Sequence, residues 1–481
     1  MPSQTKKITL DTAALFFGRA VGLLLGVVRL NYLATYLGVA NFGILNFATY
    51  FTALFQTLFD LGMAQLITRE ISRDPSQSSQ LLGRTIVLKT IIVFVASLLV
   101  GLVTLISGFD RVTNWAVLLT TAALAINGIS MVFLSAFQAH RKMVTVSIAN
   151  IANDAIISGA IILLIPLFPS VVTALALIVF VSVVNLGVLV GVYYKIVGAP
   201  EYGVDLNAWK LMLKEGTPMA VSALGISTYT FIGPTILKYY RGEAEVGLYS
   251  AGFKLISILT LVPTAFTQIV FPIFSSFLST APHKLGKALQ DSLRVMLEIS
   301  IPLAVGTIIL APRIIAALYP PAFTPSAFVL QVVIAGNSLG YLAWILYTFL
   351  IALGRQRFCM WNSLGVATFV VIANILVVPI YGFSGTAVVT TITDVVLFAS
   401  LMSYTVRIGY RFYDLMLFTK VGGAAFVMGG VLHFGGFLPL ALVIPCGFCV
   451  YALMLLAVRV FGDQEREIIG KVLGYAKDRT D

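Results

Sequence analysis

The chain has 481 residues, of which 59% are hydrophobic and only 11% charged, and its mean hydropathy is +0.98. These values lie far outside the range of soluble proteins, so they exclude an ordinary globular enzyme and predict a polytopic membrane protein. The net charge of +11 follows the connections between apolar segments, and it needs no nucleic-acid partner to account for it.

Runs of about 20 apolar residues mark the membrane spans, because a helix of that length crosses the hydrocarbon core. Each span must satisfy its backbone hydrogen bonds internally, so we predict an all-α fold. The fourteen predicted spans are 12–34, 43–66, 82–107, 113–139, 143–165, 171–194, 212–238, 247–272, 295–312, 327–351, 358–380, 384–406, 417–435 and 437–460.

The first span carries two arginines, Arg19 and Arg29, at membrane depth. An arginine in hydrocarbon costs about 2.5–3.5 kcal/mol, so each needs a physical reason to be there. Glycines at every fourth position of this span allow another backbone to approach closely. Arg19 and Arg29 are therefore predicted to face a polar cavity. The alternatives are a salt bridge from Arg19 to Asp60 and snorkelling of Arg29 to the outer interface.

Lysines and arginines are distributed unequally over the connections. Alternate connections, beginning with the N-terminus, hold 24 of the 31 cations, and the opposite connections hold four. The positive-inside rule therefore places both termini in the cytoplasm of a multi-pass protein of the cell (inner, cytoplasmic) membrane. The three remaining cations, Arg19, Arg29 and Lys254, are assigned to the interior of spans.

A short motif recurs in the second half of the chain. Leu37–Ile44 matches Arg241–Leu248, with Gly38, Ala40 and Gly43 corresponding to Gly242, Ala244 and Gly247. Spans 1 and 7, and spans 2 and 8, are therefore equivalent and have the same orientation, which is typical of a transporter built from two parallel six-helix repeats. Prolines in the seventh and eighth spans predict kinks, at a hinge or binding site or for packing alone.

The repeat sets the predicted domains. They are an N-terminal six-helix bundle at 1–196, a cytoplasmic linker at 197–211, a C-terminal six-helix bundle at 212–406, an extra helix pair at 407–461 and a cytoplasmic tail at 462–481. The tail has apolar residues on one helical face, so it is either an interfacial helix or a solvated segment.

Polar stripes run along the second and eighth spans. They comprise Asn46, Thr49, Gln56 and Asp60 on the second span and Ser250, Ser257 and Gln268 on the eighth, where Lys254 lies on the same face. Lipid would penalise such stripes, so we expect them to line a cavity, with interhelical hydrogen bonding as the alternative.

Two carboxylates lie near mid-membrane, Asp154 in the fifth span and Asp394 in the twelfth. Buried carboxylates at this depth are candidates for H⁺ or Na⁺ coupling, and hydrogen bonding to neighbouring Asn or Thr side chains is the alternative.

Motifs for catalysis and cofactor binding are not found. The scattered histidines suggest no metal site, and the Cys446–Cys449 pair lies in an apolar helix where the cysteines are read as small packing residues. No phosphate-cradling, GxSxG or HExxH motif occurs, and no connection is long enough for a catalytic domain. We therefore predict no enzyme and no cofactor, with H⁺ or Na⁺ coupling left open.

The sequence around the first two spans resembles a known family. Tyr36-Leu37-Gly38 through Phe42-Gly43, then Asp60-Leu61-Gly62, then Thr68-Arg69-Glu70-Ile71 are similar to the start of oligosaccharide flippases of the polysaccharide-transport family. That family belongs to the superfamily that also holds multidrug exporters and lipid II flippases. The extra pair 417–460 resembles its fourteen-span members.

The resemblance implies two six-helix bundles that form a V around a central cavity. It also implies movement of an undecaprenyl-pyrophosphate-linked oligosaccharide from the cytoplasmic to the outer leaflet by alternating access. Membrane lipids surround such a protein, and a polysaccharide polymerase or glycosyltransferase is an expected partner.

The intramembrane cations agree with an anionic head group, since arginine and lysine bind phosphate strongly in a low dielectric. Arg29, Lys254 and Arg19 are thus the predicted substrate-binding residues. A lipid II flippase and a cation-coupled exporter of drugs or metabolites are the alternative functions. A glycan polymerase is disfavoured because no loop could hold its catalytic groups.

Overall fold

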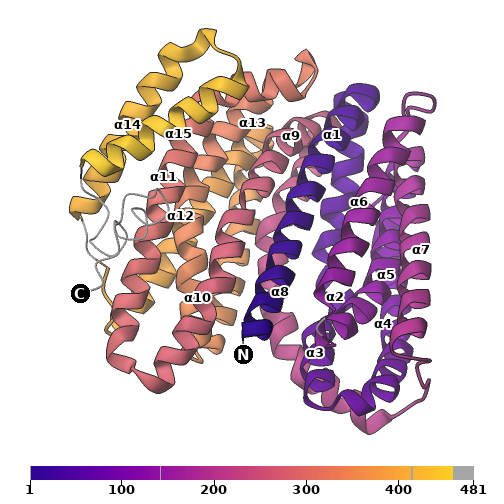
Figure 1. Cartoon of the computed structure of the whole chain (residues 1–481). Helices are drawn as coiled ribbons and strands as arrows, with labels where there is room; N and C mark the ends of the chain where they lie inside the picture. The colour runs from indigo at the N-terminus through magenta and orange to yellow at the C-terminus, as the bar shows by residue number, and fades with distance from the viewer. Residues whose placement is uncertain (1, 141, 413–414, 459–481) are drawn as a thin grey trace. The chain divides into compact units, whose positions relative to one another are not determined.

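The computed structural model describes residues 2–140, 142–412 and 415–458. Every regular element in these ranges is helical, which confirms the all-α prediction. Twelve of the helical segments found there are long and apolar enough to cross a membrane (Figure 1). The tail 462–481, predicted as an interfacial helix or a solvated segment, lies outside the described residues.

Fifteen α-helices make up the described chain, together with four short 3₁₀ turns. The helices are α1 (Pro2–Leu54), α2 (Gln56–Asp60), α3 (Met63–Arg73), α4 (Ser78–Ile106), α5 (Arg111–Ala139), α6 (Met143–Leu164), α7 (Val171–Ile196), α8 (Leu206–Arg241), α9 (Glu243–Leu259), α10 (Leu261–Thr280), α11 (Leu285–Leu318), α12 (Ser326–Ala352), α13 (Gln356–Arg407), α14 (Leu415–Phe434) and α15 (Leu440–Ala457). The 3₁₀ turns are η1 (Pro75–Gln77), η2 (Pro282–Lys284), η3 (Pro321–Phe323) and η4 (Gly435–Phe437).

Two of the helices are each broken by a single non-helical glycine. Gly38 in α1 has φ 71° and ψ 176°, and Gly382 in α13 has φ 56° and ψ −138°. Both lie where the sequence predicts a turn between two spans, and glycine is the residue that adopts such a conformation without a Cβ clash. The two breaks support the count of fourteen spans, which stays a prediction.

The second predicted span, 43–66, is not one continuous helix. The α-helical hydrogen bonding is interrupted at Phe55, whose N–H donates to the Thr52 carbonyl at 3.0 Å. The chain then turns through Leu61 and Gly62, which have φ values of 48° and 73°. A left-handed pair cannot continue a right-handed helix, so α2 ends there and α3 begins in a new direction. Leu61 is the one non-glycine residue with positive φ among the described residues. Hydropathy reports burial but not this local reversal.

The eighth predicted span is interrupted at nearly the equivalent place. Its two parts, α9 and α10, meet at Thr260, one position after Leu259, which corresponds to Phe55 when Gly43 is aligned with Gly247. Pro263 has no N–H with which to bond the Leu259 carbonyl, and this loss favours a break at that point. Of the two prolines predicted to kink this span, Pro263 therefore lies next to an observed interruption, whereas Pro272 lies inside α10.

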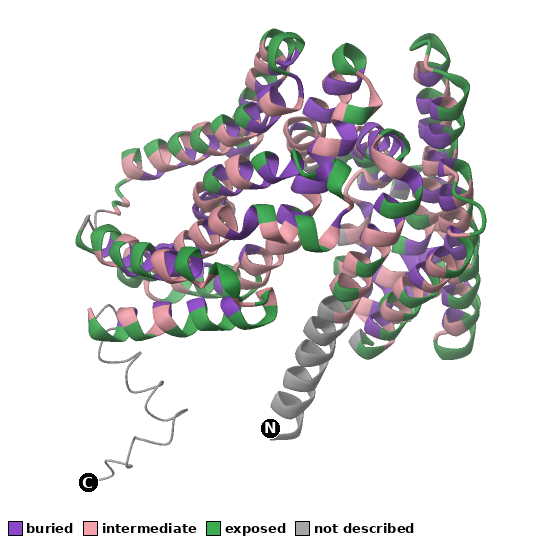
Figure 2. Cartoon of the chain, turned by 90° about the horizontal axis from the view of Figure 1, so that it is seen from above, coloured by how far each residue is buried: buried purple, intermediate pink, exposed green. Residues whose placement is uncertain are grey.

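Contacts divide the chain into two compact units. Unit 1 comprises Met1–Ala251, Leu318–Pro325 and Met360–Val389, and unit 2 comprises Gly252–Ala317, Ser326–Cys359 and Thr390–Asp481. Unit 1 thus contains the first six predicted spans together with parts of the second repeat. Within each unit, buried residues lie on the faces that the helices turn toward one another (Figure 2).

The predicted linker between the repeats belongs to unit 1 and is packed against α4. The backbone N–H of Glu201 donates to the Ser79 carbonyl at 3.1 Å, and Arg84 Nη1 lies 2.9 Å from Asp205 Oδ2. A Cβ atom at Gly83 would collide with the Glu201 carbonyl. The segment between α7 and α8 is therefore fastened to the first turns of α4.

Helices α14 and α15 lie within the range 407–461 of the predicted C-terminal pair, and they pack on α11 within unit 2. A Cβ atom at Gly429 would lie 2.9 Å from the Ile309 side chain, and Tyr451 donates a hydrogen bond to the Glu298 carbonyl at 2.7 Å. Cys446 and Cys449 are free and exposed on α15. The sequence predicts that they are small packing residues of the core, and this prediction is wrong.

Candidate functional site

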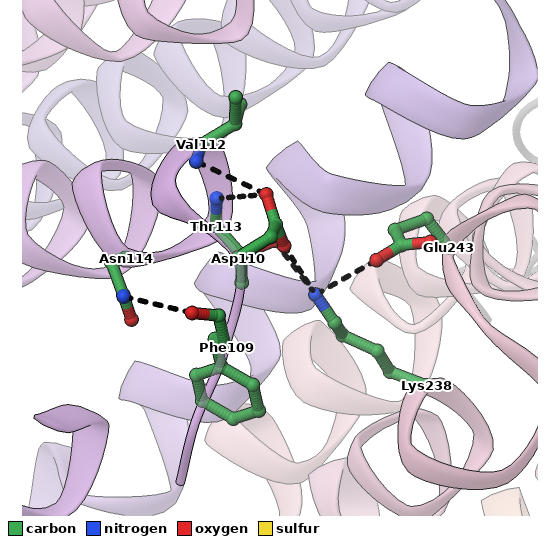
Figure 3. Close-up of polar contacts among 7 residues, drawn as sticks. All are labelled: Phe109, Asp110, Val112, Thr113, Asn114, Lys238 and Glu243. Atoms are coloured by element: carbon green, nitrogen blue, oxygen red, sulfur yellow. Dashed lines mark hydrogen bonds and ion pairs between the residues drawn. The ribbon is translucent and has the colours of Figure 1, made fainter. Parts of the chain in front are cut away.

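A buried lysine gathers three helix ends of unit 1 on the side that the cation count places outside. Lys238, in the last turn of α8, is only 8% exposed. Its Nζ atom lies 3.1 Å from Glu243 Oε1 and 3.6 Å from Asp110 Oδ1, and it donates to Thr113 Oγ1 at 2.7 Å (Figure 3). The rings of Phe47 and Phe109 also lie within cation–π distance of Nζ. We call Lys238, Asp110, Thr113 and Glu243 the outer cluster.

Asp110 enters the outer cluster because it caps α5. Its Oδ2 atom accepts the backbone N–H groups of Val112 at 3.0 Å and Thr113 at 3.1 Å, as an N-cap residue does (Figure 3). Burial by itself would raise the pKa of Asp110, but the hydrogen bonds from Thr113 and Val112 and the charge of Lys238 hold it below its ordinary value. The carboxylate is thus ionised when it faces Lys238.

The repeated glycine motif lies directly beside the outer cluster. Gly242, at the repeat position of Gly38, also has positive φ, at 83°. Gly43 and Gly247 are so close to the other copy of the motif that neither could carry a Cβ atom. The two copies therefore cross at backbone contact, as small residues permit.

A second charged pair lies deeper in unit 1. Arg29 Nη1 in α1 is 4.0 Å from Asp154 Oδ1 in α6, and both side chains are partly exposed. Asp154 fits against α1 because Gly22 has no side chain there: a Cβ atom at Gly22 would lie 2.5 Å from Asp154 Oδ2. Two residues that the sequence assigns to different roles, substrate binding and ion coupling, are thus neighbours.

Asp60 pairs with Lys89, a cation that the count of charges assigns to a connection outside the membrane spans. Lys89 Nζ in α4 lies 3.0 Å from Asp60 Oδ1 and also reaches the Asp60 carbonyl at 3.4 Å. Lys89 is 1% exposed, although the cation count assigns it to a cytoplasmic connection. The statement that three cations lie inside spans is therefore wrong, since Lys89 is a further one. The side chain of Arg19 lies outside the described residues.

The Asp60–Lys89 pair also explains one of the sequence motifs. Asp60 immediately precedes the left-handed Leu61–Gly62 turn, and the lysine holds both its carbonyl and its carboxylate. The Asp60-Leu61-Gly62 motif thus forms a turn between α2 and α3 that is fastened to α4.

The remaining stripe residues divide into buried and exposed positions. Asn46 and Ser250 are fully buried in unit 1, and Asn46 donates to the Phe42 carbonyl at 2.7 Å. Thr49 and Ser257 bond carbonyls of their own helices at 2.9 and 3.1 Å. Exposed positions of the stripes are Thr49, Gln56, Ser257 and Gln268, and Lys254 is half-buried. Their predicted exposure to a cavity stays a prediction.

Unit 2 contains an apolar groove of about 620 Å³. It lies among α9, α11, α12, α14 and α15, and its lining includes Ile299, Leu303, Met428, Phe448 and Leu455. The lining has three polar side chains, those of Glu298, Thr307 and Tyr451. Glu298 is paired with Arg294 at 3.2 Å, and the Tyr451 hydroxyl bonds the Glu298 carbonyl. Such a site suits a hydrocarbon chain, because few of its groups could orient a polar ligand.

The helical fold, the apolar spans and the charged groups at membrane depth define a polytopic membrane protein of the transporter class. The profile of the family described as "Polysaccharide biosynthesis protein" matches residues 8–278, and the chain belongs to that family. This confirms the resemblance drawn from the first two spans.

Two curated relatives carry transport names. The chain is 22% identical to a "Putative O-antigen transporter" of Shigella flexneri over 358 residues, covering 71% of this chain and 84% of the relative. It is 24% identical to the "Probable flippase AglR" of Haloferax volcanii over 170 residues, covering 34% of this chain and 36% of the relative. These relatives are transporters rather than enzymes, as the sequence predicts.

Solved structures share the fold. Lipid II flippase MurJ in an inward closed conformation matches with a TM-score of 0.76 at 16% identity, covering 97% of this chain and 99% of MurJ. The MATE transporter VcmN of Vibrio cholerae matches with a TM-score of 0.61 at 15% identity, covering 87% of this chain and 99% of that one. The fold is therefore that of the superfamily that the sequence indicates.

Lys238 and Lys89 are not among the predicted site residues. Both fall among the connection cations in the count because they lie near the ends of predicted spans. A signal is present for Lys238, since acidic Glu243 and Asp110 lie at predicted outer ends where acidic side chains can pair with it. For Lys89, the signal in the sequence is its position inside an apolar run, because apolar residues flank it on both sides.

Proposed function

We propose that this protein is a flippase that moves an undecaprenyl-pyrophosphate-linked oligosaccharide from the cytoplasmic to the outer leaflet by alternating access. The observation that carries the proposal is the apolar groove of unit 2, which offers a hydrocarbon chain a site inside the protein. The names of the relatives, an O-antigen transporter and a flippase, support the same substrate class.

The groove has the right chemistry for part of a polyprenyl chain. Its volume of about 620 Å³ is in the usual range of ligand sites, and the lining is made mostly of Leu, Ile, Met and Phe side chains. Burial of apolar surface contributes roughly 25 cal/mol per Å², so a tail that enters the groove gains binding energy in proportion to the length that it buries. A tail of undecaprenyl length would extend beyond the groove into the bilayer.

The head group needs a cation at membrane depth. Arg29 is the described arginine that meets this requirement in unit 1, and its 4.0 Å distance from Asp154 leaves the guanidinium weakly paired. A pyrophosphate carries more charge than one carboxylate and accepts a bidentate hydrogen bond, so it competes well for Arg29. Lys254, in the part of α9 that belongs to unit 2, is proposed independently of Arg29 as a substrate-binding cation.

The outer cluster provides contacts that a transport cycle could break and re-form. It joins the ends of α5, α8 and α9 through one lysine with two carboxylates and a hydroxyl. Alternating access requires the outer ends of helices to separate, and an ion cluster that becomes hydrated on opening loses less free energy than a dry apolar contact of the same area.

A lipid II flippase is the second candidate. The match to MurJ extends over 97% of this chain and therefore includes the α14–α15 pair that lines the groove. The two candidates share a polyprenyl-pyrophosphate anchor and differ in the sugar, which no described residue distinguishes.

The experiment is deletion in the host, followed by analysis of lipid-linked sugars on each side of the membrane. We expect a polyprenyl-linked oligosaccharide to accumulate on the cytoplasmic side. Accumulation of lipid II instead selects the second candidate. An unchanged lipid pool with altered drug tolerance would contradict both and favour an exporter.

Reconstituted protein tests the groove and the cation separately. Ala452→Phe places a ring in the groove, and Ala399→Phe places the same ring on an exposed position of α13 as a control. We expect the first variant to reduce transport of the full-length lipid more than tenfold and the second to have little effect. Arg29→Gln should also lower transport, while Arg29→Lys should retain part of it. Equal activity of Ala452→Phe and wild type would rule out a tail in the groove.

A further inference from the structure

Asp394 is a half-buried carboxylate in the middle of a membrane span of unit 2. It lies near the centre of the part of α13 that runs from the Gly382 break to the end of the helix at Arg407. At about 1.5 Å per residue, it is roughly 18 Å from either end of this part of the helix. A charged carboxylate at that depth is expensive unless it is paired or neutralised.

The carboxyl group packs against the glycine side of α12. A Cβ atom at Gly340 would lie 3.1 Å from Asp394 Oδ1 and 3.4 Å from Oδ2. One turn earlier, a Cβ atom at Gly336 would lie 2.7 Å from the Cα atom of Thr391. Two glycines thus bring α12 and α13 into backbone contact and hold the carboxyl group between them.

The polar groups around Asp394 are incompletely satisfied. Within the described chain Asp394 accepts one hydrogen bond, from Asn337 Nδ2 at 3.3 Å, and forms no ion pair. Asn337 Oδ1 and the Tyr341 hydroxyl are buried without a partner in the same part of the chain. A single long hydrogen bond is too little for a carboxylate at this depth, and an unused acceptor next to it indicates a missing donor.

The other ionisable groups of the packed elements do not supply that donor. Tyr341 is the ionisable neighbour on α12 that interacts electrostatically with Asp394. On α11, Arg294 pairs with Glu298 and Arg313 donates to the Leu438 carbonyl. Helix α10 has no ionisable side chain, and the charged residue at mid-depth of α9 is Lys254, which forms no ion pair with Asp394 in the described chain.

We propose that Asp394 is a reversible proton-binding site built between α12 and α13, with Asn337 and Tyr341 as its hydrogen-bonding partners. In the protonated form the Asp394 O–H donates to the amide oxygen of Asn337, which satisfies the orphaned acceptor after a rotation of the amide. In the ionised form the carboxylate keeps the Asn337 amide as donor and recruits the Tyr341 hydroxyl or water.

A proton fits this site better than a metal cation does. Hard cations take about six oxygen ligands, whereas the side chains that interact with Asp394 add one amide oxygen and one phenol to its carboxylate. Thr391 Oγ1 is already committed to the Val332 carbonyl at 2.8 Å. The close contact with Gly340 also leaves little room for an ion and its ligands.

Proton binding gives the protein a means of using a pH gradient. Loss of the proton would place a charge between two helices in backbone contact, and hydration of that charge would favour their separation. This consequence deepens the proposed function, on which it rests, by naming the driving ion. The site itself is defined without reference to the substrate.

The test is modification of the full-length protein in membranes by dicyclohexylcarbodiimide. The O–H of a protonated carboxyl group in an apolar environment adds across a C=N bond of this carbodiimide: the proton goes to nitrogen and the carboxyl oxygen bonds the central carbon. The O-acylisourea then rearranges to a stable N-acylurea, so the adduct reports the protonated form. We expect an adduct on Asp394, found by mass spectrometry, that falls about tenfold per pH unit once the pH exceeds the pKa of the site. Asp394→Asn should lose the adduct, and the Arg-paired Glu298 should remain unmodified. Replacing choline chloride by sodium chloride at constant pH should change nothing.

Two results would overturn the proposal: no adduct on Asp394 at any pH from about 5.5 to 9, or protection by sodium. A transport assay distinguishes this failure from failure of the proposed function. If wild type moves lipid-linked oligosaccharide, an imposed pH gradient should accelerate wild type and leave Asp394→Asn unaffected. If wild type moves no such lipid but Asp394 is labelled with the expected pH dependence, the proton site stands and the substrate assignment is wrong.

Discussion

Gly43 and Gly247 occupy equivalent positions of the two repeats, and each lies against a backbone carbonyl of the other copy. The Glu243 carbonyl fills the space of a Cβ atom at Gly43, and the Val39 carbonyl fills it at Gly247. Val39 and Glu243 are themselves equivalent positions when the two copies of the motif are aligned. The crossing is therefore reciprocal, as a local two-fold relation between the repeats requires.

This crossing predicts that neither glycine tolerates even a methyl group. Gly43→Ala and Gly247→Ala should each lower the stability of the protein by about 1–3 kcal/mol, because the backbones must separate. The measurement is the thermal midpoint in detergent, followed by size-exclusion chromatography. Gly187→Ala is the control, since that glycine of α7 has open space around it. The double variant should lose less stability than the two single variants lose together, because both substitutions open the same contact.

Lys238 should stabilise the joined state of α5, α8 and α9. Lys238→Met leaves Asp110 and Glu243 facing each other without a cation, so we expect a loss of about 1–3 kcal/mol and a longer distance between spin labels at Arg111 and Tyr239. Lys238→Arg should keep most of the stability and a label distance close to that of wild type. Lys195→Met, at an exposed position, is the matched control. An unchanged label distance in Lys238→Met would show that the cluster does not hold these helix ends together.

His140 should make the protein less stable in acid. Its Nε2 atom lies 2.9 Å from Ser78 Oγ, which also contacts the Tyr193 hydroxyl at 3.3 Å. Burial, and secondarily the charge of Lys142, lowers the pKa of His140 below its ordinary value of 6.5. The unfolded chain therefore takes up the proton first, so this stabilisation is complete above pH 6.5 and is lost as the pH falls through the folded value.

The measurement for His140 is the thermal midpoint of wild type and His140→Gln from about pH 8 to 5. Wild type should lose stability on acidification beyond what the variant loses. Parallel curves would mean that His140 contributes nothing to the pH dependence.

The Lys89–Asp60 pair should show coupling in a double-mutant cycle. Lys89→Met leaves Asp60 unpaired next to the left-handed turn, and we expect the free energy of unfolding to fall by about 1–3 kcal/mol. The loss should lie toward the lower end of this range, because the Asp60 side chain is 41% exposed. Asp60→Asn combined with Lys89→Met should recover part of that loss. Strictly additive single substitutions would show that the two side chains do not interact.

Much of the fold could be predicted because hydropathy is a local quantity. The apolar runs, the breaks at Gly38 and Gly382 and the C-terminal helix pair all follow from residues close in sequence, and the structure contains them. The interruption of the second span could not be predicted, because Leu61 adopts a left-handed conformation that its residue type does not favour. The surrounding packing, including the hold of Lys89 on Asp60, imposes it.

The candidate site was predicted less completely. The sequence placed Arg29 and Asp154 at membrane depth but did not show that they are neighbours. It offered Arg19 as a partner of Asp60, whereas the described partner is Lys89. Depth follows from counting along a helix, but pairing depends on which helices are adjacent and how each is rotated about its axis.

The amino-acid sequence is enough to predict an all-helical membrane protein, because transfer of apolar side chains into lipid is summed residue by residue along the chain. Short motifs between Tyr36 and Ile71 add the family resemblance, and the repeated glycine motif adds the two related halves. The burial of Lys238 among carboxylates, the backbone contact of Gly43 and Gly247 and the packing of Asp394 on Gly340 are visible in the tertiary structure alone. These relations join residues far apart in sequence, and their free energies depend on distances of a few ångströms that no local pattern contains.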